Sequence, residues 1–560
     1  MSFTGIIIAV MTFLTIGIWH PIVIKTEYYW GTRPWVLYLL VGISCCVAAL
    51  FIENVYLSSF LGVFGASALW GIGELFAQKK RVEKGWFPKN PKRQHSVSNK
   101  LIVSVMLLMQ MTTAMAQDGF NRSNMEVIDD MAPGWNLGNT FEGVATWAGV
   151  DFLNNKGGLG AETAWQGTKT TQEIIDFVKS LGFKSVRIPC AWAFGHISNA
   201  STYEIDSLWM KRVKEVVDYC INDGLYVILN DHWDGGWLEN HIKDSDAATI
   251  AKNKEVLTAL WTQIANAFKD YDEHLLFAGL NEPNAENQAA TNNLIQYNQT
   301  FVDAVRATGG NNAKRILVVQ GPSTNIEHTC NFMTDKMPTD IVEGRLAIEI
   351  HYYNPWQFWG MEKDESWGKV FYYWGQGNHL SGSTHNATWG EEADMKKQLQ
   401  MMKTHFVDKG YPVVIGEFGA NWRDLSSLSG ESQAKHNASI KAHYRELHRL
   451  CKEMGGMVPM TWDTNYPDQE GTKGNMTIID RQNLKVFGIY ALEGINEIYP
   501  RPSESGVEEV KNDAAPDAGN GLRVTTTTPL YRLDGRKVSS SSQLPTGLYV
   551  CEGKKFVVNR

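Results

Sequence analysis

The sequence predicts an α/β fold, a (β/α)8 TIM barrel, over residues 117–500 of the 560-residue chain. Two observations predict it. Eight short apolar runs recur between residues 134 and 463, and helix-period segments separate them. The runs are apolar at nearly every position, which is typical of parallel strands buried on both faces. Eight of them favour a closed barrel over an open sheet, the alternative that the same pattern allows.

The strand runs begin with "GWNLGNT" and end with "GMVPMTWD". In chain order they are 134–140, 184–189, 225–231, 275–283, 315–322, 345–353, 411–419 and 456–463. Helical periodicity is found in the segments between them: Thr171–Leu181, Ile205–Asp223, Ile250–Lys269, Ala393–Asp408 and Gln433–Met454. Strand and helix therefore alternate, as a barrel requires.

Polar side chains that can do chemistry lie at the end of nearly every predicted strand. They are Arg187, His232, Asn281, Glu282, His351, Tyr353, Glu417 and Trp462. In a barrel the carboxyl ends of the strands form one face, where active sites are built. Any one of these residues could be an ordinary turn residue, but the set predicts a site.

Glu282 and Glu417 end the fourth and seventh predicted strands. Two carboxyl groups across a sugar are sufficient to hydrolyse a glycosidic bond, one as the proton donor and the other as the nucleophile. Arg187 can hold one of them ionised. Asn281 can bind a sugar hydroxyl, and Trp462 offers a flat face on which a pyranose ring can stack.

The motifs "GWNLGNT", "VRIP", "LNEP", "HYYNP", "GEFG" and "TWD" occur in this order and resemble glycoside hydrolase family 5, from about Met125 to Tyr499. The resemblance implies a retaining mechanism with Glu282 as the acid/base and Glu417 as the nucleophile. It also implies that six residues shape the subsite where the bond breaks: Arg187, His232, Asn281, His351, Tyr353 and Trp462. Tyr353 would form a hydrogen bond to the nucleophile, and Asn281 one to the sugar 2-hydroxyl. One departure is "NDHWDGGW", where Trp233 replaces a second histidine that relatives often carry.

We therefore expect an exported, retaining endo-β-1,4-glucanase acting on a β-linked polysaccharide. The alternatives are a xyloglucanase, a mixed-linkage glucanase or a β-mannanase of the same family, and, from other classes, a non-catalytic polysaccharide-binding barrel or a membrane protein active through residues 1–99. We expect no metal, no cofactor and a monomer. The net charge of −8 gives no reason to expect nucleic acid.

Ten tryptophans fall in or beside the predicted strand-to-helix segments, and we expect about half in the core and the rest along an open cleft. Seven cysteines without paired spacing are expected to be free.

Residues 1–99 have a different character. The apolar runs Gly5–Ile24, Trp35–Phe51 and Val55–Phe76 are each roughly long enough to span a membrane. Seven basic residues between Lys79 and Arg93 place that end in the cytoplasm and the N-terminus outside. The segment, with "HPIVIKTEYYWG" and "RVEKGWFPKNPKR", resembles a small bacterial membrane family of unknown function.

Two further segments predict export. Residues 100–116 have the layout of a signal peptide, with an apolar run and a cleavage site after Ala116. Residues 501–521 read as a linker. Residues 522–560, with "LDGRKV" and "LPTGLYV", form a predicted small β module that resembles a type IX secretion sorting domain of Bacteroidetes. This implies the type IX machinery as a partner and a cell-surface or extracellular enzyme, with the N-terminal segment in the inner membrane.

Overall fold

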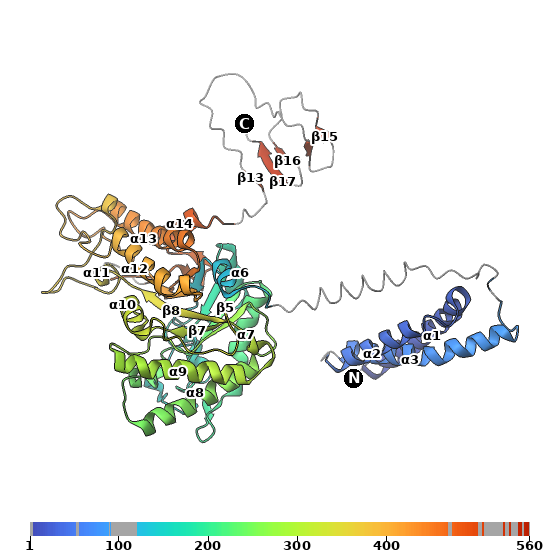
Figure 1. Cartoon of the computed structure of the whole chain (residues 1–560). Coiled ribbons are helices and arrows are strands. Elements are labelled where there is room, and N and C mark those ends of the chain that lie inside the picture. Colours follow the sequence, from blue (N-terminus) through green and yellow to red (C-terminus); the bar gives the residue numbers. More distant parts are fainter. Residues whose placement is uncertain are drawn as a thin grey trace. The chain divides into compact units, whose positions relative to one another are not determined.

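The computed structural model describes residues 4–51, 55–88, 90, 120–468 and 473–501, together with five short strands near the C-terminus. The chain divides into two compact units, residues 1–117 and 118–560. Each is described by itself (Figure 1). The finer domain boundaries within them, and the segment 100–116, which lies outside the described residues, stay predictions.

Three helices form the described part of the first unit: α1 (Thr4–Trp30), α2 (Trp35–Leu50) and α3 (Val55–Glu83). Among the described residues one helix, Ser58–Glu83, is long and apolar enough to cross a membrane, and Trp35–Ala49 is a shorter apolar helix. Small residues bring α2 and α3 together. A Cβ on Gly65 would lie 2.7 Å from Cys46 Sγ. One helix thus meets the length and composition of a membrane span, and the three predicted spans stay a proposal.

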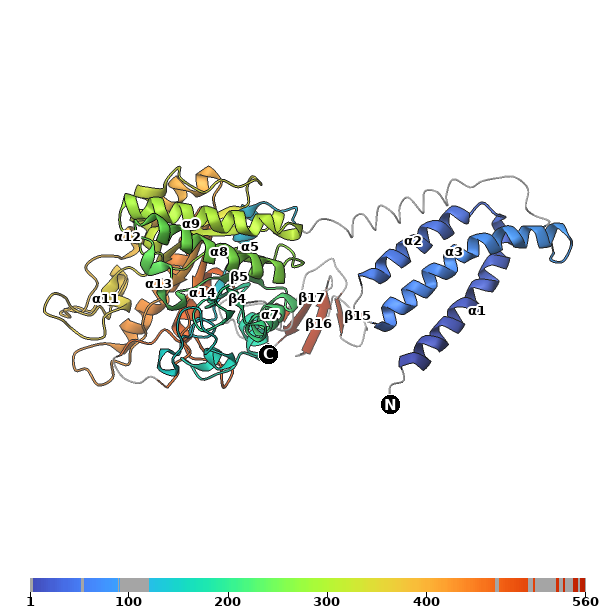
Figure 2. The same ribbon diagram turned by 90° about the horizontal axis from the view of Figure 1, so that it is seen from below.

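Eight parallel strands close into a barrel in the second unit (Figures 1 and 2). They are β1 (Gly134–Asn136), β2 (Ser185–Ile188), β5 (Tyr226–Asn230), β6 (Leu275–Ala278), β7 (Leu317–Gln320), β8 (Leu346–Tyr352), β9 (Val413–Phe418) and β10 (Met457–Thr461). β1 pairs with both β2 and β10, which closes the ring. All eight lie inside the eight predicted runs, so the predicted barrel is confirmed.

Helices cover the outside of the barrel (Figure 1). They are α6 (Gln172–Ser180), α7 (Ser207–Asn222), α8 (Ala247–Ala267), α9 (Gln288–Ala307), α12 (Glu392–His405), α13 (Gln433–Met454) and α14 (Ile489–Ile498). Two very short helices, α10 (Ile326–His328) and α11 (Trp356–Trp359), lie in the loops after β7 and β8. Several begin at a side-chain cap. Asp206 accepts from two backbone N–H groups of α7, and Asp246 accepts from Thr249 N at the start of α8. Their apolar faces then pack on the strands, which fixes the strand ends where the site forms.

A short helix, α5 (Asn124–Asp130), closes the amino end of the barrel. Ser123 and Glu126 form a capping box that starts it. Asn124 Nδ2 donates to the backbone oxygens of Leu346 and Gly410, at 2.9 and 3.0 Å. Val127 and Ile128 are fully buried against the inward side chains at the strand bottoms. The opposite, carboxyl end is thereby left as the open face.

Smaller sheets decorate this framework. β3 (Ile197–Asn199) pairs with β4 (Glu204–Ile205), and β11 (Ile479–Asp480) pairs with β12 (Lys485–Val486). In the tail, five strands are ordered β13-β17-β16-β14-β15. Their bounds are β13 (Val507–Glu508), β14 (Leu530–Arg532), β15 (Lys537–Val538), β16 (Gly547–Cys551) and β17 (Lys554–Val558). The identity of this tail as a sorting module stays a proposal.

Candidate active site

The structure brings all eight predicted residues together at the carboxyl end of the barrel. Arg187 lies in β2, His351 in β8 and Glu417 in β9, and the others lie in the loops that follow β5, β6, β8 and β10. Several of the observed strands end a few residues before the polar residues that the sequence placed at their ends. β6, for example, ends at Ala278, so Asn281 and Glu282 sit in a loop and can turn into the barrel mouth.

Glu282 and Glu417 are close neighbours. One carboxyl oxygen of each, with a ring nitrogen of His351, form a set of atoms that all lie within 4.8 Å of one another. The Glu282 side chain is 48% exposed and the Glu417 side chain 8%. The pair therefore has one carboxyl group open to the cleft and one held in the barrel floor.

Cationic and neutral donors surround Glu417. Arg187 Nη1 lies 3.2 Å from Glu417 Oε1, and Tyr353 OH donates to Glu417 Oε2 at 3.1 Å. His232 Nε2 lies 4.0 Å from Oε1. Burial and the charge of Arg187 lower the pKa of His232 well below its usual range, so this histidine is neutral. The carboxylate form of Glu417 thus receives two direct hydrogen bonds.

His351 links the carboxyl groups. Its Nδ1 lies 2.7 Å from Glu282 Oε1 and 3.7 Å from Glu417 Oε2, and its Nε2 lies 3.3 Å from Glu349 Oε1. Burial opposes protonation of the ring, but these three carboxylates outweigh it and raise the pKa of His351 to about 10. His351 is therefore a cation at neutral pH.

The two glutamates respond differently to this surrounding. Burial opposes the ionisation of Glu282, but the hydrogen bond and charge of His351 outweigh it and lower its pKa. For Glu417 burial outweighs the charges of His351 and Arg187, and its pKa is raised. In the free site the proton closest to Glu282 is consequently the one on His351 Nδ1.

Glu349 is a site residue that the sequence reasoning missed. It is fully buried, it lies 3.0 Å from Arg187 Nη2, and it accepts from Gln320 Nε2 at 2.7 Å. Gly416 in β9 makes room for the Glu349 side chain, because a Cβ at that position would clash with Glu349 Oε1. The signal was available, because Glu349 interrupts an apolar strand two residues before His351 and so points to the same face.

Asn136 and Asn281 fix the arginine. Arg187 Nη1 donates to Asn136 Oδ1 at 3.1 Å, and Nη2 donates to Asn281 Oδ1 at 2.7 Å. With its oxygen engaged, Asn281 has its NH₂ group to offer a sugar hydroxyl. Asn136 was not among the predicted site residues, although it lies in the predicted first strand.

The tryptophans divide between core and cleft. Trp462 is 9% exposed, and its ring stacks on His232 with centroids 5.9 Å apart. Trp192 and Trp374 are fully buried. Trp233, Trp356 and Trp389 are between 37% and 46% exposed. The substituted position Trp233 is therefore available to a ligand.

A cavity of about 350 Å³ opens beside Glu282 and His351. The loop after β7 supplies Ser323 and Asn325 to its wall, and Gln398 and Trp389 complete the polar and aromatic lining. This cavity therefore adjoins the exposed carboxyl group of Glu282.

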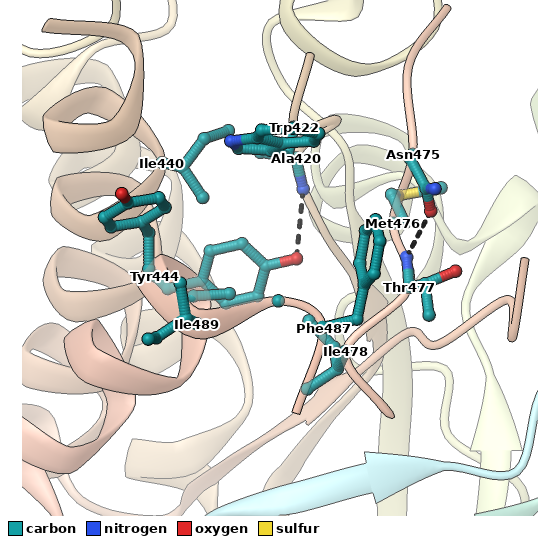
Figure 3. A pocket seen from close by; sticks show the side chains of 13 residues that line it. Ala420, Trp422, Ile440, Tyr444, Asn475, Met476, Thr477, Ile478, Phe487 and Ile489 are labelled. Carbon is teal, nitrogen blue, oxygen red and sulfur yellow. Dashed lines mark hydrogen bonds between the residues drawn. The ribbon is translucent and has the colours of Figure 1, made fainter. Parts of the chain in front are cut away.

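A second, apolar pocket of about 130 Å³ lies beside the loop that follows β9 (Figure 3). Trp422, Met476 and Phe487 line it, and Ala420 N donates to Tyr444 OH at 3.3 Å. Ala420 lies three residues after Glu417, so this contact helps to hold the end of β9 in place.

The central cluster of Glu282, His351 and Glu417 is poorly suited to binding a metal ion. Glu282, His351 and Glu417 are close enough to ligate an ion by distance, but the raised pKa of His351 favours its protonated form, which cannot ligate, and Arg187 already donates to Glu417. The six cysteines whose side chains the structure describes are free thiols.

Comparison with family models gives two matches. A model described as Cellulase (glycosyl hydrolase family 5) matches residues 148–467, and a domain of unknown function, DUF4491, matches residues 2–93. The predicted resemblance of each segment is confirmed. Nothing in these matches identifies the C-terminal tail as a sorting domain.

Curated relatives are enzymes. A xyloglucan-specific endo-β-1,4-glucanase of Bacteroides ovatus is 37% identical over 362 residues, which are 62% of this chain and 66% of that protein. An endoglucanase A of Paenibacillus barcinonensis is 33% identical over 383 residues, 64% of this chain and 87% of that protein.

The similar solved structures are also glucanases. A family 5 xyloglucan-specific β-1,4-glucanase from a ruminal metagenomic library, in complex with XXLG, has 50% identity and a TM-score of 0.61, covering 68% of this chain and 96% of that one. A broad-specificity endoglucanase from Ruminococcus champanellensis with bound cellotriose has 32% identity and a TM-score of 0.55, covering 67% of this chain and 98% of that one.

Proposed function

The chain belongs to the cellulase family, glycosyl hydrolase family 5, and on that premise we propose that it is a retaining endo-β-1,4-glucanase that acts best on xyloglucan. The observation that carries the mechanism is the closeness of the two glutamates, whose oxygens lie within 4.8 Å. Retaining enzymes hold their carboxyl groups about 5–5.5 Å apart, and inverting ones about 6.5–9.5 Å.

In this mechanism Glu417 attacks the anomeric carbon while Glu282 protonates the leaving oxygen. Arg187 and Tyr353 donate to the carboxylate form of Glu417, which they favour and orient. A covalent glycosyl-enzyme forms, and water then displaces Glu417 with Glu282 acting as the base.

The proton of Glu282 has a local source. A bound neutral sugar excludes water from the exposed side of Glu282, which disfavours its charged form. His351 Nδ1, 2.7 Å away, can then return its proton to Glu282 Oε1. With Glu282 protonated and His351 neutral, Arg187 balances one of the two remaining carboxylates, Glu349 and Glu417.

Two variants test the roles. Glu282→Ala and Glu417→Ala are each expected to abolish polymer hydrolysis. Azide should rescue Glu417→Ala and give a glycosyl azide of inverted configuration, because it then attacks in place of the missing carboxylate. Full polymer activity in either variant would refute the assignment.

Xyloglucan is favoured by the relatives, since two of the four described above are named for this polymer, one of them at 50% identity. The polar cavity beside Glu282 offers room for a branch on the leaving side. Initial rates on xyloglucan, carboxymethylcellulose, barley glucan and glucomannan decide the preference. A higher rate on one of the last three would support the same mechanism with a different preferred polymer. No hydrolysis of any of the four would favour a non-catalytic, polysaccharide-binding barrel.

We also propose that α1 to α3 form three membrane spans with the N-terminus outside, and that residues 100–116 direct export of the enzyme with cleavage after Ala116. The basic residues after α3 and the close α2–α3 packing support this. The tail, residues 522–560, would carry the enzyme through a type IX route. Mass spectrometry of the extracellular enzyme tests both ends, because a mature N-terminus at Gln117 and loss of the tail are expected.

A further inference from the structure

Glu239 is a buried carboxyl residue beside the acid/base that the mechanism above does not use. It lies at the start of a short 3₁₀ turn, Glu239–His241, in the loop after β5, and it is 5% exposed. Its Oε1 accepts from the backbone N–H of Glu282. Its own backbone oxygen accepts from Asn284 N at 3.1 Å. Glu239 therefore holds this turn at two points, at Glu282 itself and two residues after it.

Other contacts hold the residues on either side of Glu282 in this turn. Ser323 N donates to the Pro283 oxygen at 2.9 Å, and Ala285 N donates to Ser323 Oγ at 3.1 Å. Arg187 holds the side chain of Asn281. These contacts fix the residues before and after Glu282, whereas Glu239 supplies the acceptor for the Glu282 N–H.

The position of Glu282 depends on this backbone contact, whereas the position of Glu417 is fixed by its barrel strand. The Glu282 side chain is half exposed and its carboxyl group is held by His351, whereas Glu417 sits inside a barrel strand with two donors. A misplacement of about 1 Å in a reacting group can lower a rate about 100-fold.

The chemistry of Glu239 suits a neutral acceptor. Burial and the nearby charges of Glu282 and Glu417 raise the pKa of Glu239 to about 8. Near neutral pH it is thus a carboxylic acid, and a glutamine amide has the same shape and the same acceptor oxygen.

We propose that Glu239 is a positioning residue that aims the Glu282 carboxyl group at the leaving oxygen by fixing the Glu282 backbone. The inference rests on the proposed role of Glu282 as acid/base. It predicts that loss of Glu239 produces an enzyme that is poor at protonating a leaving group while its nucleophile stays intact.

The leaving group separates this defect from a general structural one. Polymer cleavage expels a poor leaving group that needs the proton, whereas 2,4-dinitrophenyl β-cellotrioside expels a good one that does not. In the full chain, Glu239→Ala is expected to lower kcat/KM on the polymer about 10- to 100-fold and on the aryl glycoside less than about 3-fold. Azide should raise its turnover of the aryl glycoside and give the azide product of retained configuration.

Glu239→Gln keeps the acceptor oxygen and should restore most of the polymer activity lost in Glu239→Ala. The matched control is Glu142→Ala, which removes a buried carboxyl group that accepts from Thr140 N at 2.7 Å in the loop after β1. It should lower thermal stability and reduce the two rates by the same factor. If Glu239→Ala does not fold, Glu239→Asp, one methylene too short to reach the Glu282 N–H, replaces it in the comparison.

Equal losses on both substrates, or no recovery in Glu239→Gln, would overturn the proposal. Glu282→Ala, measured alongside, separates the two levels of inference. If Glu282→Ala itself lacks the leaving-group dependence, the proposed role of Glu282 is wrong. If Glu282→Ala has it and Glu239→Ala lacks it, only the positioning role of Glu239 falls.

Discussion

Glu349→Gln tests the charge balance under the active site. Glu349 is fully buried, 3.0 Å from Arg187 and 3.3 Å from His351. At an effective dielectric constant of about 20, its attraction to Arg187 alone is about 5 kcal/mol. Glutamine removes that charge, and its NH₂ group would face one of three donors, from Arg187, His351 or Gln320. Breaking a buried pair in this way costs about 3–5 kcal/mol.

We therefore expect Glu349→Gln to lower the free energy of unfolding by about 3–5 kcal/mol. Guanidinium unfolding followed by tryptophan fluorescence measures it, from the shift in midpoint at an unchanged slope. Glu453→Gln is the control, since it breaks a 2.5 Å pair with Arg449 whose side chains are 58% and 36% exposed. That change should cost less than about 1 kcal/mol.

A Glu349→Gln protein within about 1 kcal/mol of the parent would refute the reasoning. It would mean that Glu349 is not an ionised partner of Arg187 and His351. The raised pKa of His351 would then need another source, which a titration of His351 in the variant would reveal.

Three further outcomes are expected. Tyr353→Phe removes a hydrogen bond to ionised Glu417, so kcat/KM should fall about 10- to 150-fold and its acid limb should move to higher pH; a loss under about 3-fold would contradict this. Burial lowers the pKa of His436, His443 and His448 on α13 to about 4. Because an unfolded histidine titrates at about pH 6.5, the free energy of unfolding should fall between pH 6.5 and 4, by about 1.4 kcal/mol per pH unit for each histidine. His448→Leu should remove a third of that slope in unfolding measured between pH 6 and 4.5, and an unchanged slope would show that His448 does not contribute. Gly416→Ala would place a Cβ on Glu349 Oε1, so soluble, active protein should be lost; normal yield and activity would show that the strand can move.

The barrel could be predicted because its signals are local. Eight apolar runs and the helices between them each follow from periodicity, and Glu282 and Glu417 stand out as the polar ends of two such runs. The resemblance then supplied roles that spacing alone does not contain. Glu349 and Glu239 were missed for different reasons. Glu349 had a visible signal, a charge within an apolar strand, that was not used.

Glu239 had no such signal. It lies 43 residues before Glu282 in the chain, and its partner is a backbone N–H, which no side-chain pattern reveals. Its place depends on how two loops meet in three dimensions. The same holds for the closeness of Glu282 and Glu417, whose carboxyl oxygens lie within 4.8 Å of each other. The distance across a barrel mouth depends on strand tilt and loop path, which the sequence does not state.

The helix that closes the amino end of the barrel limits how far the enzyme can be trimmed from its amino side. Cleavage after Ala116 would leave only a few residues before Phe120 and Arg122, whose backbone oxygens accept from Arg345. A protease acting a little further along would remove these contacts and the cap of α5. The stability of the barrel would then depend on how well the few residues before α5 resist digestion, at the end of the barrel opposite to Glu282 and Glu417.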